Sequence, residues 1–318
     1  MEWQWPIIIY LWVAGIAGGA YFVTFLAHRF SGGHYHDAKR VATALGVPAV
    51  VLGVVMLVID LGHPFRAWHL FVRFQPLSPM SIGSWLLLLW SALAVVLFLT
   101  WWAGNLSGRR LSGSLVPVIQ FFQRLKPVSG LLDWIEFVLS ILLVAYTGVL
   151  LSATSQPLWA NTFLLPVLFV SSAIATGVAA LNLVGSLGVP QVSTSLMSKL
   201  CKAASVVCVV EILALAGLLI LSPAELTPVA FAAGVSSSFS VSTVEAAHSV
   251  NQLLFGSLSF PFWVGVVLIG LLLPLSVEFS LLLRGVEKAP RELIALLGLM
   301  VLAGGLILRA VIVFAGQM

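Results

Sequence analysis

Charged residues are scarce in this sequence. Only 8% of its 318 residues are Asp, Glu, Lys or Arg, and 60% are hydrophobic, whereas roughly 25% of the residues in a soluble domain are charged. A water-soluble fold has no core large enough to hide so much apolar surface. The composition therefore excludes an ordinary soluble protein and predicts an integral membrane protein.

Cysteine is also rare, because the sequence holds only Cys201 and Cys208. On one predicted helix their Cα atoms lie roughly 10 Å apart by helical rise, which is too far for a disulfide. An iron–sulfur or zinc site built on four cysteines needs more soft ligands than this protein has. We therefore expect two small apolar helix residues, and no metal or iron–sulfur cluster bound by the protein itself.

Apolar runs with few charges recur along the whole sequence, and each is long enough to cross a hydrocarbon core of about 30 Å as a helix. A transmembrane barrel would instead show short alternating segments. The start, Met1 to Trp5, has no basic region or cleavage site, so we expect the first helix to be retained rather than removed as a signal peptide. The predicted fold is an all-α membrane protein with eight spans, roughly 5–28, 42–61, 81–103, 130–152, 161–185, 200–221, 259–284 and 291–315.

Basic residues are distributed unequally between alternate loops. Two of them, Arg66 and Arg73, fall in one set of loops, and Arg309 lies near the end of the last helix on that side. Cationic side chains are retained on the cytoplasmic side, so both termini and the loops 62–80, 153–160 and 222–258 are predicted to be extracytoplasmic. The other set, predicted to be cytoplasmic, holds Arg29, Lys39, Arg40, Arg109, Arg110, Arg124, Lys126, Lys199, Lys202, Arg284, Lys288 and Arg291.

The histidines do not pair across the interiors of predicted helices. A membrane b-type haem needs axial side chains on facing helices, so a haem-binding anchor is not expected. Three histidines lie at the predicted inner loops and three in outer segments: His28, His34 and His36, and His63, His69 and His248.

Two stretches of small residues resemble each other. Ile16–Gly19 in the first span and Ile174–Gly177 in the fifth lie on helices that run in the same direction. Small residues let helices approach closely, so tight packing explains the similarity without a duplication. A single membrane domain, 1–318, is predicted, with 1–152 and 153–318 as candidate four-helix halves.

The outer segment 222–258 contains a helix-start signal. Ser242–Glu245 reads as a capping box and predicts a short helix. Two roles remain open for this segment, a docking platform for a partner and a lipid-facing connector.

Acidic residues inside predicted spans are functional candidates, because an unpaired buried charge costs several kcal/mol. Asp133 and Glu136 share one face of the fourth span with Ser140 and Thr147, at spacings of i, i+3, i+7 and i+14. Glu211 lies in the middle of the sixth span, and Glu278 lies in the inner half of the seventh. The acids are predicted to form a proton pathway; the alternative is protonated or hydrogen-bonded structural residues.

A denser polar and aromatic set gathers at the predicted outer ends of the helices. A quinone, which is an apolar ring with two carbonyl oxygens, needs a site of this kind. A phenol hydrogen-bonds to a carbonyl oxygen, and an ionisable group exchanges its proton. Anchoring in the aromatic belt is the alternative for Tyr10, whereas Tyr146 lies about a turn and a half inside its predicted helix end. The set comprises Tyr10, Asp60, His63, Arg66, His69, Tyr146, Gln156 and Arg309.

Five segments, in this order along the sequence, resemble the NrfD/PsrC family, the membrane subunits of polysulfide reductase, tetrathionate reductase and related complexes. The resemblance spans the whole protein, and the ordered set is more specific than any one motif. The segments are WPIIIYLWVAGIAGG at Trp5 to Gly19, DLGHPFR at Asp60 to Arg66, PLSPMSIGSW at Pro76 to Trp85, YTGVLLS at Tyr146 to Ser152 and LRAVIVFAGQ at Leu308 to Gln317.

This resemblance implies a menaquinone site near the outer face. It also implies an extracytoplasmic partner with four [4Fe–4S] clusters, which passes electrons to a molybdopterin catalytic subunit or a multihaem cytochrome; no nucleic acid is expected. Tyr146 matches the family's quinone-contacting tyrosine, and Tyr10 falls where a relative has a quinone-contacting histidine. Asp60 falls near an acidic position at the same helix end.

The leading hypothesis is thus a quinone-interacting anchor in a bacterial or archaeal cytoplasmic (inner) membrane that oxidises menaquinol. Tyr146 would bind a quinol oxygen, Tyr10 would be a second contact, and Asp60 and His63 would accept protons. A proton- or ion-coupled transporter and a structural anchor without quinone are the alternatives. The terminal substrate and the direction of the quinone chemistry depend on other polypeptides.

Overall fold

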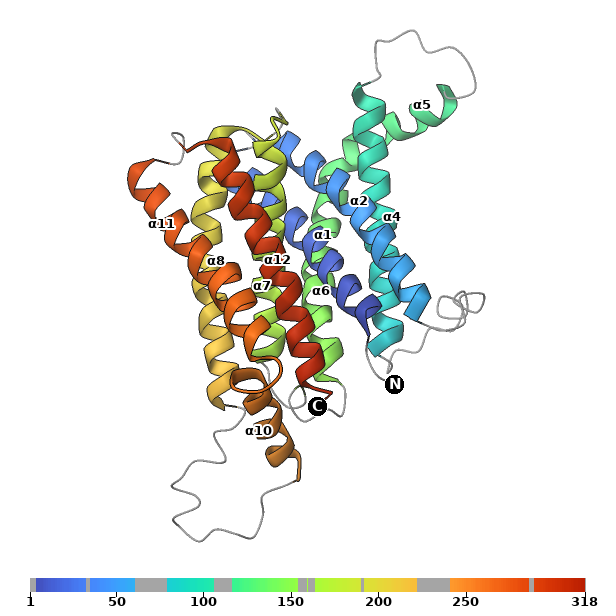
Figure 1. The fold of residues 1–318 in the computed structure, drawn as a ribbon. Helices are drawn as coiled ribbons and strands as arrows, with labels where there is room; N and C mark the ends of the chain where they lie inside the picture. Colours follow the sequence, from blue (N-terminus) through green and yellow to red (C-terminus); the bar gives the residue numbers. More distant parts are fainter. Residues whose placement is uncertain are drawn as a thin grey trace.

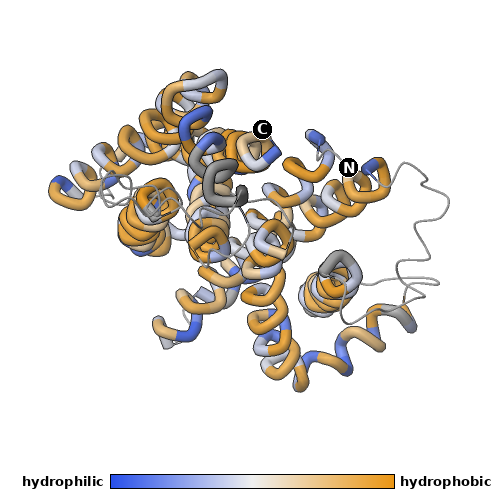
Figure 2. Tube along the Cα trace, turned by 90° about the horizontal axis from the view of Figure 1, so that it is seen from below, coloured by the Kyte–Doolittle hydropathy of each residue, from blue (hydrophilic) through white to orange (hydrophobic). Residues whose placement is uncertain are grey.

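The structure is a computed structural model that describes residues 4–32, 35–60, 79–105, 116–153, 159, 164–189, 192–221, 241–285 and 289–317. Among these residues, eight helical spans are long and apolar enough to cross a membrane, which confirms the predicted fold class. Hydrophobic residues cover most of the length of these helices (Figure 2). The spans are α1 (Trp5–Phe30), α2 (His36–Asp60), α4 (Pro79–Asn105), α6 (Ser129–Ser152), α7 (Leu164–Ser186), α8 (Thr194–Leu221), η4 (Pro261–Leu272) continued by α11 (Leu273–Arg284), and α12 (Arg291–Ala315).

Several helices extend beyond the apolar runs or lie outside them. α2 begins at His36 and α8 at Thr194, about six residues before the predicted starts, because a helix continues into polar residues once it has left the hydrocarbon core. The short amphipathic helix α5 (Val116–Arg124) was not predicted. α10 (Val241–Leu254) confirms the short helix expected from the capping box.

The seventh span is not a uniform α-helix. Its first half, η4, is π-helical and passes directly into α11. π-helical turns are rare and often occur at functional sites. The hydrophobic pattern did not reveal this stretch, since almost every residue in it is apolar and no period can be read.

Two helices form the centre of the bundle. α1 and α7 have 78% and 72% of their apolar windows buried, whereas every other span has 56% or less. They cross so closely that a Cβ at Gly19 would lie 2.1 Å from the Ala173 carbonyl oxygen, and one at Gly177 would lie 2.3 Å from the Ala20 nitrogen. Tight packing therefore accounts for the repeated small residues, while the division into halves stays a prediction.

Both termini lie at the same end of the bundle, with α10 beyond them, and α5 projects at the opposite end (Figure 1). An even number of spans requires this arrangement. We call the end with the termini the outer end and the end with α5 the inner end, after the orientation that the basic residues predict.

Candidate functional site

Two buried tyrosines lie near each other at the outer end. Tyr10 on α1 is 2% exposed and Tyr146 on α6 is 7% exposed, and they lie close enough to interact electrostatically. Each lies roughly 8–9 Å inside the end of its helix, by helical rise. The structure thus brings together two of the predicted quinone contacts from segments far apart in the sequence.

Glycine backbone forms one wall beside each phenol ring. A Cβ at Gly83 on α4 would lie 1.8 Å from Cζ of Tyr146, and one at Gly53 on α2 would lie 3.4 Å from Cδ2 of Tyr10. Any side chain at position 83 would therefore displace the Tyr146 ring. Sequence reasoning missed Gly83 as a site residue, although it lies within the PLSPMSIGSW segment.

Within the part of the protein that the structure describes, neither the Tyr10 hydroxyl nor the Tyr146 hydroxyl forms a hydrogen bond. The Tyr21 hydroxyl, deeper along α1, instead donates to Oδ1 of Asp133 at 3.1 Å. A phenol both donates and accepts hydrogen bonds, so the outer pair can serve either a hydroxyl or a carbonyl oxygen of a ligand.

Asp60 is the last residue of α2 and is half-buried at the outer end. It lies about two turns beyond Gly53, whose backbone borders Tyr10. The other predicted members of the outer set, His63, Arg66, His69 and Gln156, lie outside the described residues.

A second polar cluster lies on α6 toward the inner end. Asp133 forms an ion pair with Lys39 of α2 and accepts the Tyr21 hydrogen bond. Glu136 is completely buried, and neither of its carboxyl oxygens has a partner among the described residues. An uncompensated carboxylate is costly in such a place, so Glu136 is held as a neutral acid or meets water.

The polar face of α6 continues from this cluster toward the tyrosines. The Trp90 indole nitrogen donates to the Ser140 hydroxyl at 2.8 Å, and Ser140 donates to the Glu136 carbonyl oxygen at 2.8 Å. Glu136, Ser140 and Thr147 are all fully buried. The predicted shared face is therefore confirmed, and Thr147 brings it next to Tyr146 in the sequence.

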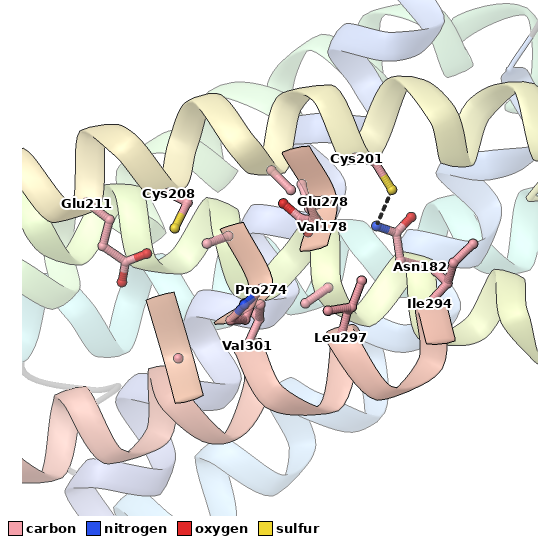
Figure 3. A pocket seen from close by; sticks show the side chains of 15 residues that line it. Val178, Asn182, Cys201, Cys208, Glu211, Pro274, Glu278, Ile294, Leu297 and Val301 are labelled. Carbon is pink, nitrogen blue, oxygen red and sulfur yellow. Dashed lines mark hydrogen bonds between the residues drawn. The ribbon is translucent and has the colours of Figure 1, made fainter. Parts of the chain in front are cut away.

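The other two predicted acids lie together in the second half of the protein. Glu211 and Glu278 both line a narrow cavity of about 20 Å³ between α7, α8, α11 and α12 (Figure 3). The Ser205 hydroxyl donates to Oε2 of Glu278 at 3.3 Å. Glu211 also borders a cavity of about 10 Å³ with Ser172; spaces of this size hold single water molecules.

Arg309 of α12 is completely buried. Its Nη1 donates to the Ser172 hydroxyl at 3.1 Å and to the Gly305 carbonyl oxygen at 2.9 Å, and Glu211 interacts with it electrostatically. A Cβ at Gly15 would lie 2.7 Å from Nη2, so this glycine makes room for the guanidinium. The sequence placed Arg309 near the outer end but offered no sign that it joins α12 to α1 and α7.

A family model described as "Polysulphide reductase, NrfD" matches residues 1–318. The chain belongs to this family. Membership confirms the resemblance inferred from the five segments, and together with the eight spans it identifies a multi-pass protein of the bacterial inner membrane.

Three curated relatives of this family member show how far the similarity extends. The C subunit of polysulfide reductase from Wolinella succinogenes is 31% identical over 323 residues, which cover 99% of this protein and 94% of the relative. Protein NrfD of Escherichia coli is 35% identical over 184 residues, covering 56% of this protein and 58% of the relative. Protein NrfD homolog of Haemophilus influenzae is 28% identical over 329 residues, covering 100% and 95%.

Proposed function

We propose that this protein is the quinone-interacting membrane subunit of a respiratory oxidoreductase complex. It oxidises menaquinol near the outer face and passes two electrons to an extracytoplasmic subunit with four [4Fe–4S] clusters, which supplies a molybdopterin subunit or a multihaem cytochrome. The observation that carries the proposal is a pair of buried tyrosines beside glycine backbone, Tyr10 and Tyr146, whose hydroxyls form no hydrogen bond to a described residue. Family membership and a relative named as part of polysulfide reductase support the reductase setting.

The chemistry of these residues fits a quinol. The Tyr146 hydroxyl accepts a hydrogen bond from a quinol oxygen and donates to it once that oxygen is a carbonyl, while Tyr10 contacts the second side of the ligand. The bare backbone at Gly83 and Gly53 makes room for the Tyr146 and Tyr10 rings themselves and so sets the position of both phenols. Protons released at this end pass to Asp60 and His63, and the electrons leave on the same side.

Proton exchange decides whether this reaction conserves energy. Release of both quinol protons and electrons at the outer side conserves none, whereas coupled uptake of further protons from the inner side and their release outside does. We assign Asp133 and Glu136 to an inner conduit along α6, and Glu211 and Glu278 to a second proton route. The buried hydroxyl face between Glu136 and Tyr146 supports the first assignment, and the two water-sized cavities beside Glu211 support the second.

The decisive experiment compares Tyr146→Phe with Tyr35→Phe in the assembled complex. Loss of the Tyr146 hydroxyl should lower quinol-dependent turnover by about 100-fold, the low end of the effect of a positioned proton-transfer group. Tyr35 is partly exposed at the inner end, where its hydroxyl lies 2.9 Å from that of Ser195, so Tyr35→Phe should keep its activity. A fully active Tyr146→Phe complex would exclude the assignment.

One observation favours a second function. Buried acids and an arginine in the second half also suit a proton- or ion-coupled transporter. Purification from native membranes separates the possibilities: iron–sulfur and molybdenum partners with extractable menaquinone support the quinone subunit, whereas a stable isolated polypeptide supports a transporter. The same partners without menaquinone indicate a structural anchor.

A further inference from the structure

The inner end of the bundle holds a cavity that borders the proposed α6 conduit at Asp133. It has a volume of about 180 Å³, far more than a single water molecule needs. It lies between α1, α2, α4 and the start of α6. Its polar lining includes Lys39, Arg40, Lys126 and Asp133, and its apolar wall includes Phe98 and Trp101 of α4.

The charges around this cavity leave a positive surplus. Lys39 is neutralised by its ion pair with Asp133. Arg40 is held from outside the cavity by Asp37, whose Oδ1 lies 2.7 Å from Nη1. Lys126, in the 3₁₀ turn Lys126–Val128 just before α6, is exposed and adds a further charge, so the group as a whole is cationic.

Arg40 also offers a donor that lacks an acceptor. Its Nε is buried and has no hydrogen-bond partner among the described residues. The guanidinium carbon lies 5.3 Å from the centre of the Trp101 ring, which together with Asp37 fixes the plane of the group. The Thr43 and Thr100 hydroxyls already donate to backbone carbonyls. Both oxygens of Asp133, the acid in the lining, are already engaged by Tyr21 and Lys39. No anionic oxygen of the lining is thus left for Arg40, whose planar guanidinium binds such an oxygen well.

The surroundings indicate a lipid as the source of that anion. α2 and α4 lie at the edge of the bundle (Figure 1), and only 33% and 28% of their apolar windows are buried. Exposed Val95 and Trp102 of α4 offer an apolar path for an acyl tail beside the cavity. Basic pockets between helices on the cytoplasmic side bind anionic head groups.

We propose that this cavity binds the phosphodiester of an anionic phospholipid, with Arg40 and Lys126 as its donors. The lipid joins α2 and α4 to the start of α6. Because the site lies at the opposite end from Tyr10 and Tyr146, its occupancy can be measured without any redox reaction.

The test uses native mass spectrometry of the purified full-length protein with added phosphatidylglycerol, phosphatidylcholine or inorganic phosphate. We expect phosphatidylglycerol to be retained in preference to phosphatidylcholine. Arg40→Gln combined with Lys126→Gln should weaken its binding by about 25-fold, or about fivefold for each basic side chain. Lys126→Gln alone, at an exposed position, should give the fivefold loss even where the double variant fails to fold.

The matched control is Lys202→Gln combined with Arg284→Gln, which removes the same charge from exposed positions on α8 and α11. It should change phosphatidylglycerol binding by less than about twofold, because head groups away from a pocket are screened by salt. Equal losses in both double variants, or equal retention of the two lipids, would overturn the proposal. If inorganic phosphate bound, phosphatidylglycerol did not, and the binding depended on Arg40 and Lys126, the anion would not come from a lipid and the proposal would be overturned.

Discussion

The two halves of the protein bury different kinds of polar residue. All four tyrosines, Tyr10, Tyr21, Tyr35 and Tyr146, lie within residues 1–152, whereas both cysteines and the buried Arg309 lie within 153–318. In the first half a polar face of α6 leads from Asp133 toward a pair of phenols. In the second half Glu278 and Glu211 border narrow cavities, and Arg309 is buried against Ser172. Quinol chemistry is thus assigned to the first half, and the second half is suited to handling charge.

A comparison of Tyr146 in the first half with Arg309 in the second half illustrates this difference. Tyr146 and Arg309 each lie roughly 9 Å inside an outer helix end. No described residue forms a hydrogen bond with the Tyr146 hydroxyl. Arg309 is held through its Nη1 by Ser172 of α7 and by Gly305 of its own helix, while its Nε and Nη2 are buried without a partner among the described residues. The Tyr146 hydroxyl is thus available to a ligand, whereas Arg309 links α12 to α7.

The largest difference between the halves should come from Gly83→Ala. The added Cβ would overlap the Tyr146 ring and displace the phenol by about 1 Å or more, which can lower turnover by about 100-fold. The control is Gly130→Ala on α6, where no heavy atom lies within 4 Å of the new Cβ. Quinol oxidation by the intact complex measures both, and equal activity of the two variants would show that the ring position is unimportant.

The counterpart in the second half is Gly304→Ala. Its Cβ would lie 2.2 Å from the Gly270 Cα, so α12 and η4 must separate at a cost of about 1–3 kcal/mol. We expect a lower melting temperature and unchanged quinol turnover per folded complex. In Gly217→Ala the new Cβ meets only the end of the Leu164 side chain at 3.2 Å, and stability should be nearly kept. A loss of turnover without a loss of stability would place quinol chemistry in the second half too.

A smaller effect should separate the two acidic routes. Glu136→Gln loses no hydrogen bond to a described side chain, yet it removes the titratable group on the α6 face. Proton uptake from the inner side should slow about tenfold, a barrier increase of ~1.4 kcal/mol. Glu278→Gln, in the second half, should slow it about twofold, or ~0.4 kcal/mol. Proteoliposomes in which Glu136→Gln leaves turnover and membrane potential unchanged would eliminate the α6 conduit.

The smallest effect should follow from replacing both cysteines by alanine. Cys208 donates to the Leu271 carbonyl oxygen at 3.6 Å, and Cys201 accepts from Asn182 at 3.8 Å. These are weak bonds of small apolar residues, so the variant should lose less than about 1 kcal/mol of stability and keep its electron transfer. Loss of electron transfer in this variant would give the second half a redox role.

The sequence predicted much of the fold because a membrane requires apolar runs of a set length. It also predicted that Glu136, Ser140 and Thr147 share a face, since helical spacing determines which residues line up along one helix. It missed α5, which is too short and too polar for a span, and the π-helical η4, where nearly all residues are apolar. Gly83 was missed because a glycine in a helix carries no sign of the ring that packs against it.

Sequence alone determined the number of spans, the predicted orientation and the depth of each polar residue, because these depend on composition and on position within one helix. Only the tertiary structure decided which faces meet: Tyr10 beside Tyr146, Gly83 under the phenol ring, and Arg309 against Gly15. Such contacts depend on the volumes of side chains from distant segments. In lipid, helices associate mainly through close packing and hydrogen bonds, and the pattern of any single span does not contain that information.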